Sequence, residues 1–246
     1  MPRIVPPTPP WTYCFRLDLA HVVRRDAYSL EQHKLLRKVL SSYPDSSVYY
    51  TDGSKTSLSV GCAVYSAGSF TLPEVATVYT AELTGILKAV QWHLDIVSSS
   101  TCIICTDSLS AGYALRDQFA YDPMTVAVWE CVKALRLKGC RTVFVWIPGH
   151  IDIAGNEAAE AAAKETSGTP EPPDRLPVRM EDLKCQIRRM VWERWQDQWS
   201  ATPSKLGLVK RSVRPWSSEC DLSRKDQVIM TRLRLGHTRI SLRDKR

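Results

Sequence analysis

Three short β-prone segments with very little chain between them constrain the fold of this protein most. They cover about residues 47–51, 59–65 and 69–78, and a Ser-Ala-Gly turn at residues 66–68 joins the last two. Links this short cannot cross over a sheet, so the three strands are expected to be antiparallel neighbours. They predict the antiparallel edge of a larger sheet.

The pattern then changes to helices that alternate with strands. Apolar residues recur at helical spacing from Leu83 to Val97, which predicts a helix of about five turns with one apolar face. The elements expected after it are a strand at 101–106, helices at 108–116 and 123–138, a strand at 141–147 and a helix at 154–166. This order predicts an α/β fold with a five-stranded mixed sheet, three strands antiparallel and two parallel, flanked by helices.

Composition divides the chain into four segments. Residues 1–45 form an N-terminal extension or connection segment with a proline-rich start and a short helix at about 28–40. Residues 46–167 hold the predicted sheet, and residues 168–178 are a proline-containing linker. Residues 179–246 form a helical C-terminal extension.

This extension is strongly basic. It holds 17 Lys and Arg against 8 Asp and Glu, a net charge of +9, whereas residues 47–178 hold 9 against 14, a net charge of −5. Helices are expected at 180–200 and from about 223 to a stop at Gly236. The distribution indicates an acid-rich site beside a surface that binds nucleic acid through sequence-independent charge. The alternative is a solvated helix pair whose tryptophans pack on the central domain.

The overall composition is that of a globular protein, with 44% hydrophobic and 24% charged residues. No apolar run approaches the roughly 18 residues of a membrane span, and prolines replace the apolar core of a signal peptide. Eight scattered cysteines fit a reducing compartment, so a soluble intracellular protein without membrane contact is expected. Cys102 and Cys105 form a C-x-x-C motif, which can bind metal or carry out redox chemistry, but their apolar strand favours two buried hydrophobic residues.

Three acidic residues are expected at one edge of the predicted sheet. Asp52 ends the first strand in an Asp-Gly-Ser turn signal, Asp107 ends the fourth strand, and Glu82 lies in the first turn of the helix after strand three. Each has an ordinary structural alternative as a turn former, a helix cap or a favourable helix-start acid. Together, they would repel unless a cation neutralised them, and oxygen ligands select Mg²⁺ or Mn²⁺. Two such ions about 4 Å apart hydrolyse phosphodiesters by in-line displacement.

The sequence also resembles a known family. The motifs are Thr51-Asp52-Gly53-Ser54, Ala81-Glu82-Leu83, Thr106-Asp107-Ser108, and the run Trp146-Ile147-Pro148-Gly149-His150 to Gly155-Asn156-Glu157. In order and spacing they resemble the ribonuclease H family across residues 46–167. The likeness is closest to the ribonuclease H domains of non-LTR retrotransposon polyproteins. The resemblance implies an RNA–DNA hybrid ribonuclease that uses two Mg²⁺ ions, with Mn²⁺ as a substitute, within or derived from a reverse transcriptase polyprotein.

The resemblance also implies roles for particular residues. The implied catalytic residues and metal ligands are Asp52, Glu82, Asp107 and Glu160, and the assisting catalytic residue is His150. Gly53 and Ser54 offer backbone N–H and hydroxyl groups to a phosphate, and Asn156 is also expected to touch nucleic acid. The alternative for Asn156 and Glu157 is that they cap the last helix. Two positions depart from the family: Glu160 stands where Asp is usual, and Asp152 stands where Gly is common.

These departures leave two functional hypotheses from different classes. The first is endonucleolytic cleavage of the RNA strand of RNA–DNA hybrids in retrotransposon replication. The second is a catalytically decayed module that binds hybrids or other nucleic acid without cleaving them. A third, another nuclease of the same fold such as an integrase, is disfavoured by the block from Gly149-His150 to Asn156-Glu157.

Overall fold

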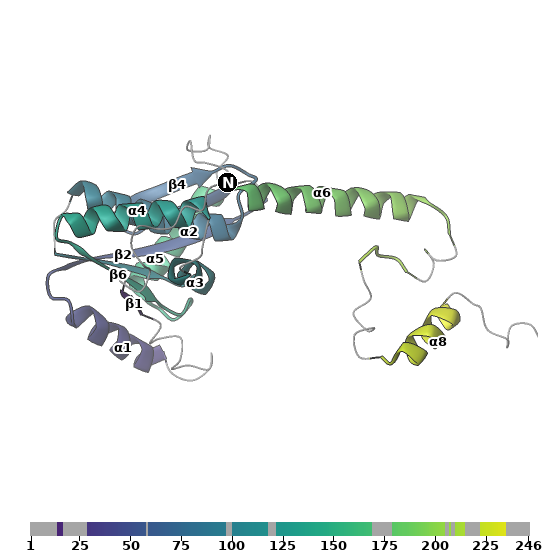
Figure 1. The fold of residues 1–246 in the computed structure, drawn as a ribbon, viewed down its shortest axis with the longest axis horizontal. Helices are drawn as coiled ribbons and strands as arrows, with labels where there is room; N and C mark the ends of the chain where they lie inside the picture. Colours follow the sequence, from purple (N-terminus) through teal and green to yellow (C-terminus); the bar gives the residue numbers. More distant parts are fainter. Residues whose placement is uncertain are drawn as a thin grey trace, which may run out of the picture. The chain divides into compact units, whose positions relative to one another are not determined.

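The computed structural model describes residues 14–16, 29–57, 59–96, 100–117, 122–168, 179–204, 207, 210–214 and 222–234. The chain separates into two compact units, Met1–Leu183 and Lys184–Arg246 (Figure 1). The predicted linker after Gly168 and the predicted helix stop at Gly236 lie outside the described residues. The four-segment division stays a prediction.

A mixed sheet forms the centre of the first unit. Its strands are β1 (Cys14–Arg16), β2 (Ser46–Lys55), β3 (Val60–Val64), β4 (Gly68–Leu72), β5 (Thr101–Thr106) and β6 (Arg141–Trp146), in the order β1-β6-β5-β2-β3-β4. Strands β2, β3 and β4 are antiparallel, and β5 and β6 continue from β2 in parallel. The predicted five-stranded mixed sheet is therefore confirmed. A sixth strand that the sequence did not predict, β1, pairs in parallel with β6.

Helices cover both faces of this sheet (Figure 1). They are α1 (Ser29–Ser41), α2 (Val78–Ile96), α3 (Leu109–Arg116), α4 (Pro123–Leu137) and α5 (Ala154–Gly168). Because side chains alternate along a strand, Ile104 packs with α2, α3 and α4 on one face, while its neighbour Ile103 packs with α1 on the other. Helix α5 lies on the α1 side, where Gly155 meets the ring of Tyr50.

The same alternation separates the two cysteines of the C-x-x-C motif. Cys102 packs in the cluster on the α2 side and Cys105 in the cluster on the α1 side, and both are fully buried. Burial raises the pKa of both thiols, so they stay protonated and apolar. The buried hydrophobic interpretation holds, and the two cysteines do not form a common metal site.

Three predicted boundaries were wrong around the acidic residues. Strand β4 ends at Leu72 rather than near Val78, because Pro73 cannot continue the strand pairing. Val78 instead begins α2, where the side chain of Thr77 accepts a hydrogen bond from Thr80 N (3.3 Å) and caps the helix. The third error concerns Asp52, since β2 continues past it to Lys55.

The C-terminal extension contains two described helices, α6 (Met180–Ala201) and α8 (Arg224–Arg234). Both agree with the helices expected from the sequence. Among the described residues, no helix is long and apolar enough to cross a membrane.

Candidate functional site

Asp52 lies at the point where β2 changes partners. Thr51 is the last residue of β2 that pairs with β5, through Thr106, while the antiparallel pairing with β3 continues to Lys55. Asp52 is therefore inside a strand, not at its end, and the expected Asp-Gly turn is wrong. Asp107 is the first residue beyond the end of β5. The carboxylates of Asp52 and Asp107 consequently lie side by side at one edge of the sheet.

Glu82 joins them because Gly53 lets α2 approach β2 closely. A Cβ on Gly53 would lie 2.6 Å from the backbone nitrogen of Glu82 and 2.9 Å from the Cβ of Ala81. Only a residue without a side chain fits this contact. Glu82 lies at the start of the second turn of α2, one turn later than predicted, because the helix begins at Val78. Carboxylate oxygens of Asp52, Glu82 and Asp107 all lie within 4.8 Å of one another.

Burial and nearby carboxylates raise the pKa values of all three groups. Burial, followed by the charges of Asp107 and Glu160, raises the pKa of Asp52 to about 7, while Lys164 partly opposes the rise. Burial and the charges of Asp52 and Asp107 hold the pKa of Glu82 well above its usual range. Burial also raises the pKa of Asp107. The cluster is electrostatically strained when all three groups are ionised, and a bound cation would relieve that strain.

Surrounding groups fix the position of Asp107. The side-chain amide of Asn156 donates to its Oδ2 (3.4 Å), and the indole of Trp146 donates to its backbone oxygen (3.0 Å). A Cβ on Gly149 would lie 2.8 Å from the same Oδ2. The loop after β6 and the start of α5 thus hold this carboxylate in place.

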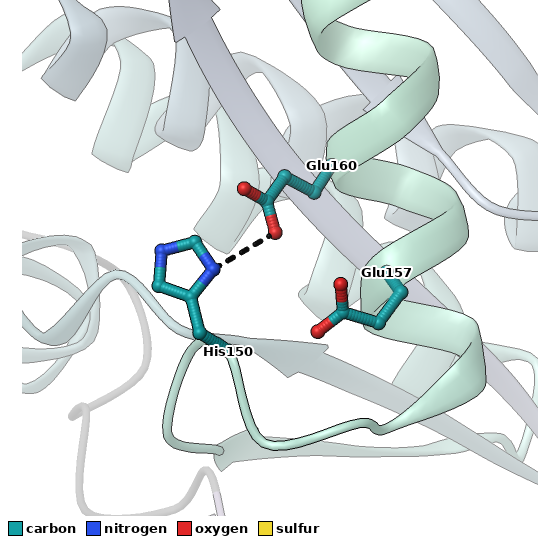
Figure 2. Close-up of side chains that lie close together, drawn as sticks. All are labelled: His150, Glu157 and Glu160. Carbon is teal, nitrogen blue, oxygen red and sulfur yellow. Dashed lines mark ion pairs between the residues drawn. The ribbon is translucent and has the colours of Figure 1, made fainter. Parts of the chain in front are cut away.

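A second group of ionisable side chains gathers around His150, on the loop between β6 and α5 (Figure 2). Ligand atoms of His150, Glu157 and Glu160 lie within 4.8 Å of one another, and His150 Nδ1 is 3.3 Å from Glu160 Oε2. Lys164, one turn further along α5, forms an ion pair with the other oxygen of Glu160. His150 and Asp152 both have left-handed backbone conformations, with φ of 58° and 59°. The loop is therefore sharply bent where His150 projects.

The predicted site residues separate into these two groups. The structure brings Asp52, Glu82 and Asp107 together, whereas Glu160 pairs with His150 and Lys164. The two groups still interact, because Glu160 and Lys164 both act on the pKa of Asp52.

The residues expected to touch nucleic acid have other contacts in the structure. Ser54 accepts a hydrogen bond from Ser167 Oγ (3.1 Å), and Asn156 is only 1% exposed and bonded to Asp107. Their contact with nucleic acid stays a prediction. From the sequence, Glu157 was expected only as a possible helix cap, and no role was predicted for Lys164. Their spacing of three and four residues from Glu160 on one helix was the signal that could have identified them.

The three acids thus come from β2, α2 and the position directly after β5. The RNase H family model matches residues 44–167, half of the chain. The chain belongs to the RNase H family. No curated protein sequence matches it significantly. Among solved structures, it is similar to the N-terminal RNase H domain of a Mycobacterium tuberculosis protein, solved as a fusion with maltose-binding protein. That similarity has 17% identity and a TM-score of 0.38, and covers 50% of this chain and 94% of the other.

Proposed function

We propose that this chain is a metal-dependent endoribonuclease that hydrolyses the RNA strand of RNA–DNA hybrids. The observation that supports this function most is the meeting of three carboxylates, from Asp52, Glu82 and Asp107, at one edge of the sheet. Membership of the RNase H family supports the same chemistry.

The donor set fits hard divalent cations. All three carboxylates offer oxygen ligands, which Mg²⁺ and Mn²⁺ prefer. Glu82 Oε2 is buried and has no hydrogen-bond partner among the described residues, so it is available to a ligand. The proposed ligands for two Mg²⁺ ions, with Mn²⁺ as a substitute, are Asp52, Glu82, Asp107 and Glu160. When bound, such ions activate water as a nucleophile and stabilise the leaving 3′ oxygen.

The side chains around the acids have supporting roles in this proposal. Asn156 orients the carboxylate of Asp107 through its amide group. His150 has a side chain that is 77% exposed, and it is proposed to transfer protons between solvent and the site. Glu160, 3.3 Å from its Nδ1, would orient the ring.

The proposed substrate contacts are local and polar. Gly53 and Ser54 follow Asp52 on β2, and the backbone N–H and hydroxyl groups of such residues bind phosphate without reading sequence. Asn156 is retained as a third proposed contact, which would require its amide to turn from Asp107 toward the nucleic acid.

A labelled hybrid tests this function directly. With Mg²⁺ or Mn²⁺, the full chain is expected to cut the RNA strand and leave the DNA strand, duplex RNA and duplex DNA intact. Asp107→Asn is expected to slow cleavage at least about 100-fold, because a metal ligand is lost. The matched control is Asp95→Asn, which removes an exposed carboxylate from the end of α2 and is expected to cut normally. An intact hybrid, or an Asp107→Asn variant as fast as wild type, rejects the proposal.

Additional nucleic acid is proposed to bind the basic second unit. Lys184–Arg246 holds 16 Lys and Arg against 6 Asp and Glu. Trp192 and Trp195 are partly exposed, and their ring centroids lie 5.3 Å apart. Trp192 also lines a groove of about 780 Å³, together with Arg189 and Arg214. Indole rings beside guanidinium groups bind single-stranded bases by stacking.

Tryptophan fluorescence tests this contact. A single-stranded oligonucleotide is expected to quench the fluorescence of the wild-type chain, and the quenching is expected to be lost in Trp192→Ala. Affinity that falls steeply with salt is expected. Unchanged fluorescence at low salt refutes it.

An intracellular role in retrotransposon replication, within or derived from a reverse transcriptase polyprotein, is also proposed and rests on the resemblance of the motifs.

One observation favours a second candidate function, a decayed module that binds hybrids without cutting them. Glu160 is the acid that departs from the family, and it is engaged by His150 and Lys164. Under this alternative, wild type binds the hybrid without metal-dependent cleavage, and Glu160→Asp restores cleavage. Cleavage by wild type excludes it.

A further inference from the structure

The residues directly after the predicted linker pack against the start of α2, the helix that carries Glu82. Arg179 and Asp182 belong to the same compact unit as the sheet, which runs to Leu183, whereas the RNase H family match ends at residue 167. Arg179 is 9% exposed and Asp182 is 0% exposed. Charged side chains buried this completely require specific partners.

Asp182 binds the first turn of α2. Its carboxylate accepts hydrogen bonds from Thr77 Oγ1 (2.8 Å) and Thr80 Oγ1 (2.7 Å). The first turn of α2 contains no acidic residue of its own. Asp182, on α6, therefore supplies the negative charge that stabilises the positive end of the α2 dipole.

Arg179 joins this contact to the start of α4. Its Nε donates to Asp122 Oδ1 (2.5 Å), and its Nη1 donates to Thr80 Oγ1 (3.1 Å) and lies 3.8 Å from Asp182 Oδ1. Asp122 also caps α4 by accepting a hydrogen bond from Thr125 N (3.0 Å). One buried guanidinium thus fixes the beginnings of two helices relative to each other.

The nearest of these contacts, at Thr80, lies two residues before Glu82 on α2. The hydroxyl of Thr80 donates to Asp182, and the carbonyl of Thr80 accepts a hydrogen bond from Thr84 Oγ1 (2.7 Å), so Thr80 links Asp182 to the turn of α2 that contains Glu82. Gly53 contacts the backbone of Glu82 separately from β2. A small shift of this turn would move the Glu82 carboxylate relative to Asp52 and Asp107.

We propose that Asp182 and Arg179 are positioning residues for Glu82, an inference that rests on the proposed metal-dependent function. The start of α6 is then part of the catalytic unit, although it lies beyond the matched domain. Without the Asp182 carboxylate, the hydroxyls of Thr77 and Thr80 lose their acceptor, the first turn of α2 relaxes, and Glu82 binds a divalent ion more weakly.

The experiment measures Mn²⁺ affinity of the full chain by electron paramagnetic resonance of the free ion, together with kcat and KM for hybrid cleavage. Asp182→Asn keeps the side-chain shape and removes the charge. It is expected to weaken Mn²⁺ binding about tenfold, as loss of a group that orients a ligand does. The KM for the hybrid is expected to stay within about twofold, and excess Mg²⁺ is expected to restore kcat. Asp95→Asn, at the other end of α2, is the matched control and is expected to resemble wild type.

Each outcome has a definite reading. If circular dichroism shows that Asp182→Asn is folded and its Mn²⁺ affinity equals that of wild type, the inference is overturned, while the proposed function stays intact. If wild type itself neither binds Mn²⁺ nor cuts the hybrid, the proposed function fails first. If Asp182→Asn does not fold, Thr77→Val removes the Thr77 hydrogen bond to Asp182 and the cap on Thr80 N but keeps the Thr80 hydrogen bond to Asp182, and wild-type Mn²⁺ affinity in that variant overturns the inference.

Discussion

Replacing Asp52 with Asn is expected to stabilise the metal-free protein while abolishing cleavage. The pKa of Asp52 is about 7 in the folded protein, against 3.8 for the unperturbed carboxyl group, so the folded state binds a proton more tightly than the unfolded state does. The stability that this proton contributes is present in full below pH 3.8 and is lost as the pH rises through 7. Because the pKa rises from 3.8 to about 7, ionised Asp52 costs the folded protein about 4 kcal/mol at pH 8.

Urea unfolding in EDTA across this pH range measures the effect. Asn resembles a protonated carboxyl in shape and stays neutral, so Asp52→Asn is expected to be about 4 kcal/mol more stable than wild type at pH 8. The difference is expected to shrink toward zero as the pH falls to 4. Adding Mg²⁺ at pH 8 should then stabilise wild type more than the variant, because the variant lacks a proposed metal ligand.

The control uses a carboxylate whose pKa is shifted in the other direction. Asp45, just before β2, is exposed, and hydrogen bonds from Ser100 lower its pKa. Asp45→Asn is therefore expected to produce no stabilisation at pH 8. The reasoning about Asp52 is refuted if Asp52→Asn and wild type differ by the same amount at every pH, or if the variant is the less stable protein at pH 8.

Three further changes test individual contacts. Gly53→Ala is expected to lower the free energy of unfolding by about 1–3 kcal/mol and to weaken Mn²⁺ binding, because the new Cβ would lie 2.6 Å from Glu82 N. The control is Gly168→Ala, where a Cβ meets nothing within 4 Å, and it should change the free energy of unfolding by under about 0.5 kcal/mol. Asp152→Gly should raise stability by about 0.5–1 kcal/mol in thermal unfolding, since it removes the strain of a left-handed conformation at φ 59°, and Asp152→Ala should not. His150→Ala should reduce kcat about 100-fold at unchanged Mn²⁺ affinity; a loss of affinity equal to the loss of rate would contradict proton transfer.

The sheet was largely predictable because its strands are separated by short links and marked by apolar runs. The antiparallel edge followed from the turn lengths alone, and the parallel pairing of β5 and β6 followed from the helices between them. Strand β1 was not predictable in this way. Its three residues are too few to show a periodicity, and its pairing of Phe15 with Phe144 joins parts of the chain that are far apart in sequence.

The error at Asp52 has a different origin. Asp-Gly is a strong local turn signal, and the sequence alone offers no reason to continue the strand through it. In the structure, Gly53 is selected by the close approach of α2, and the strand continues because β3 still pairs with it. Tertiary packing, not local preference, decided the conformation, and the same packing brought Glu82 to the site.

Glu160 was proposed as a site residue from the sequence, but its contacts in the structure were not predictable from the sequence. The resemblance implied Glu160 as a metal ligand, which stays a prediction; in the structure burial and the charges of Asp107 and Glu160 raise the pKa of Asp52. The sequence did not show that Lys164, one turn along α5, and His150 both contact the carboxylate of Glu160. A Glu side chain is one methylene longer than Asp and spans the i to i+4 distance to a lysine well. The residue that departs from the family is therefore the one that His150 and Lys164 engage, and Glu160→Asp tests whether this engagement keeps it from acting with the acidic cluster.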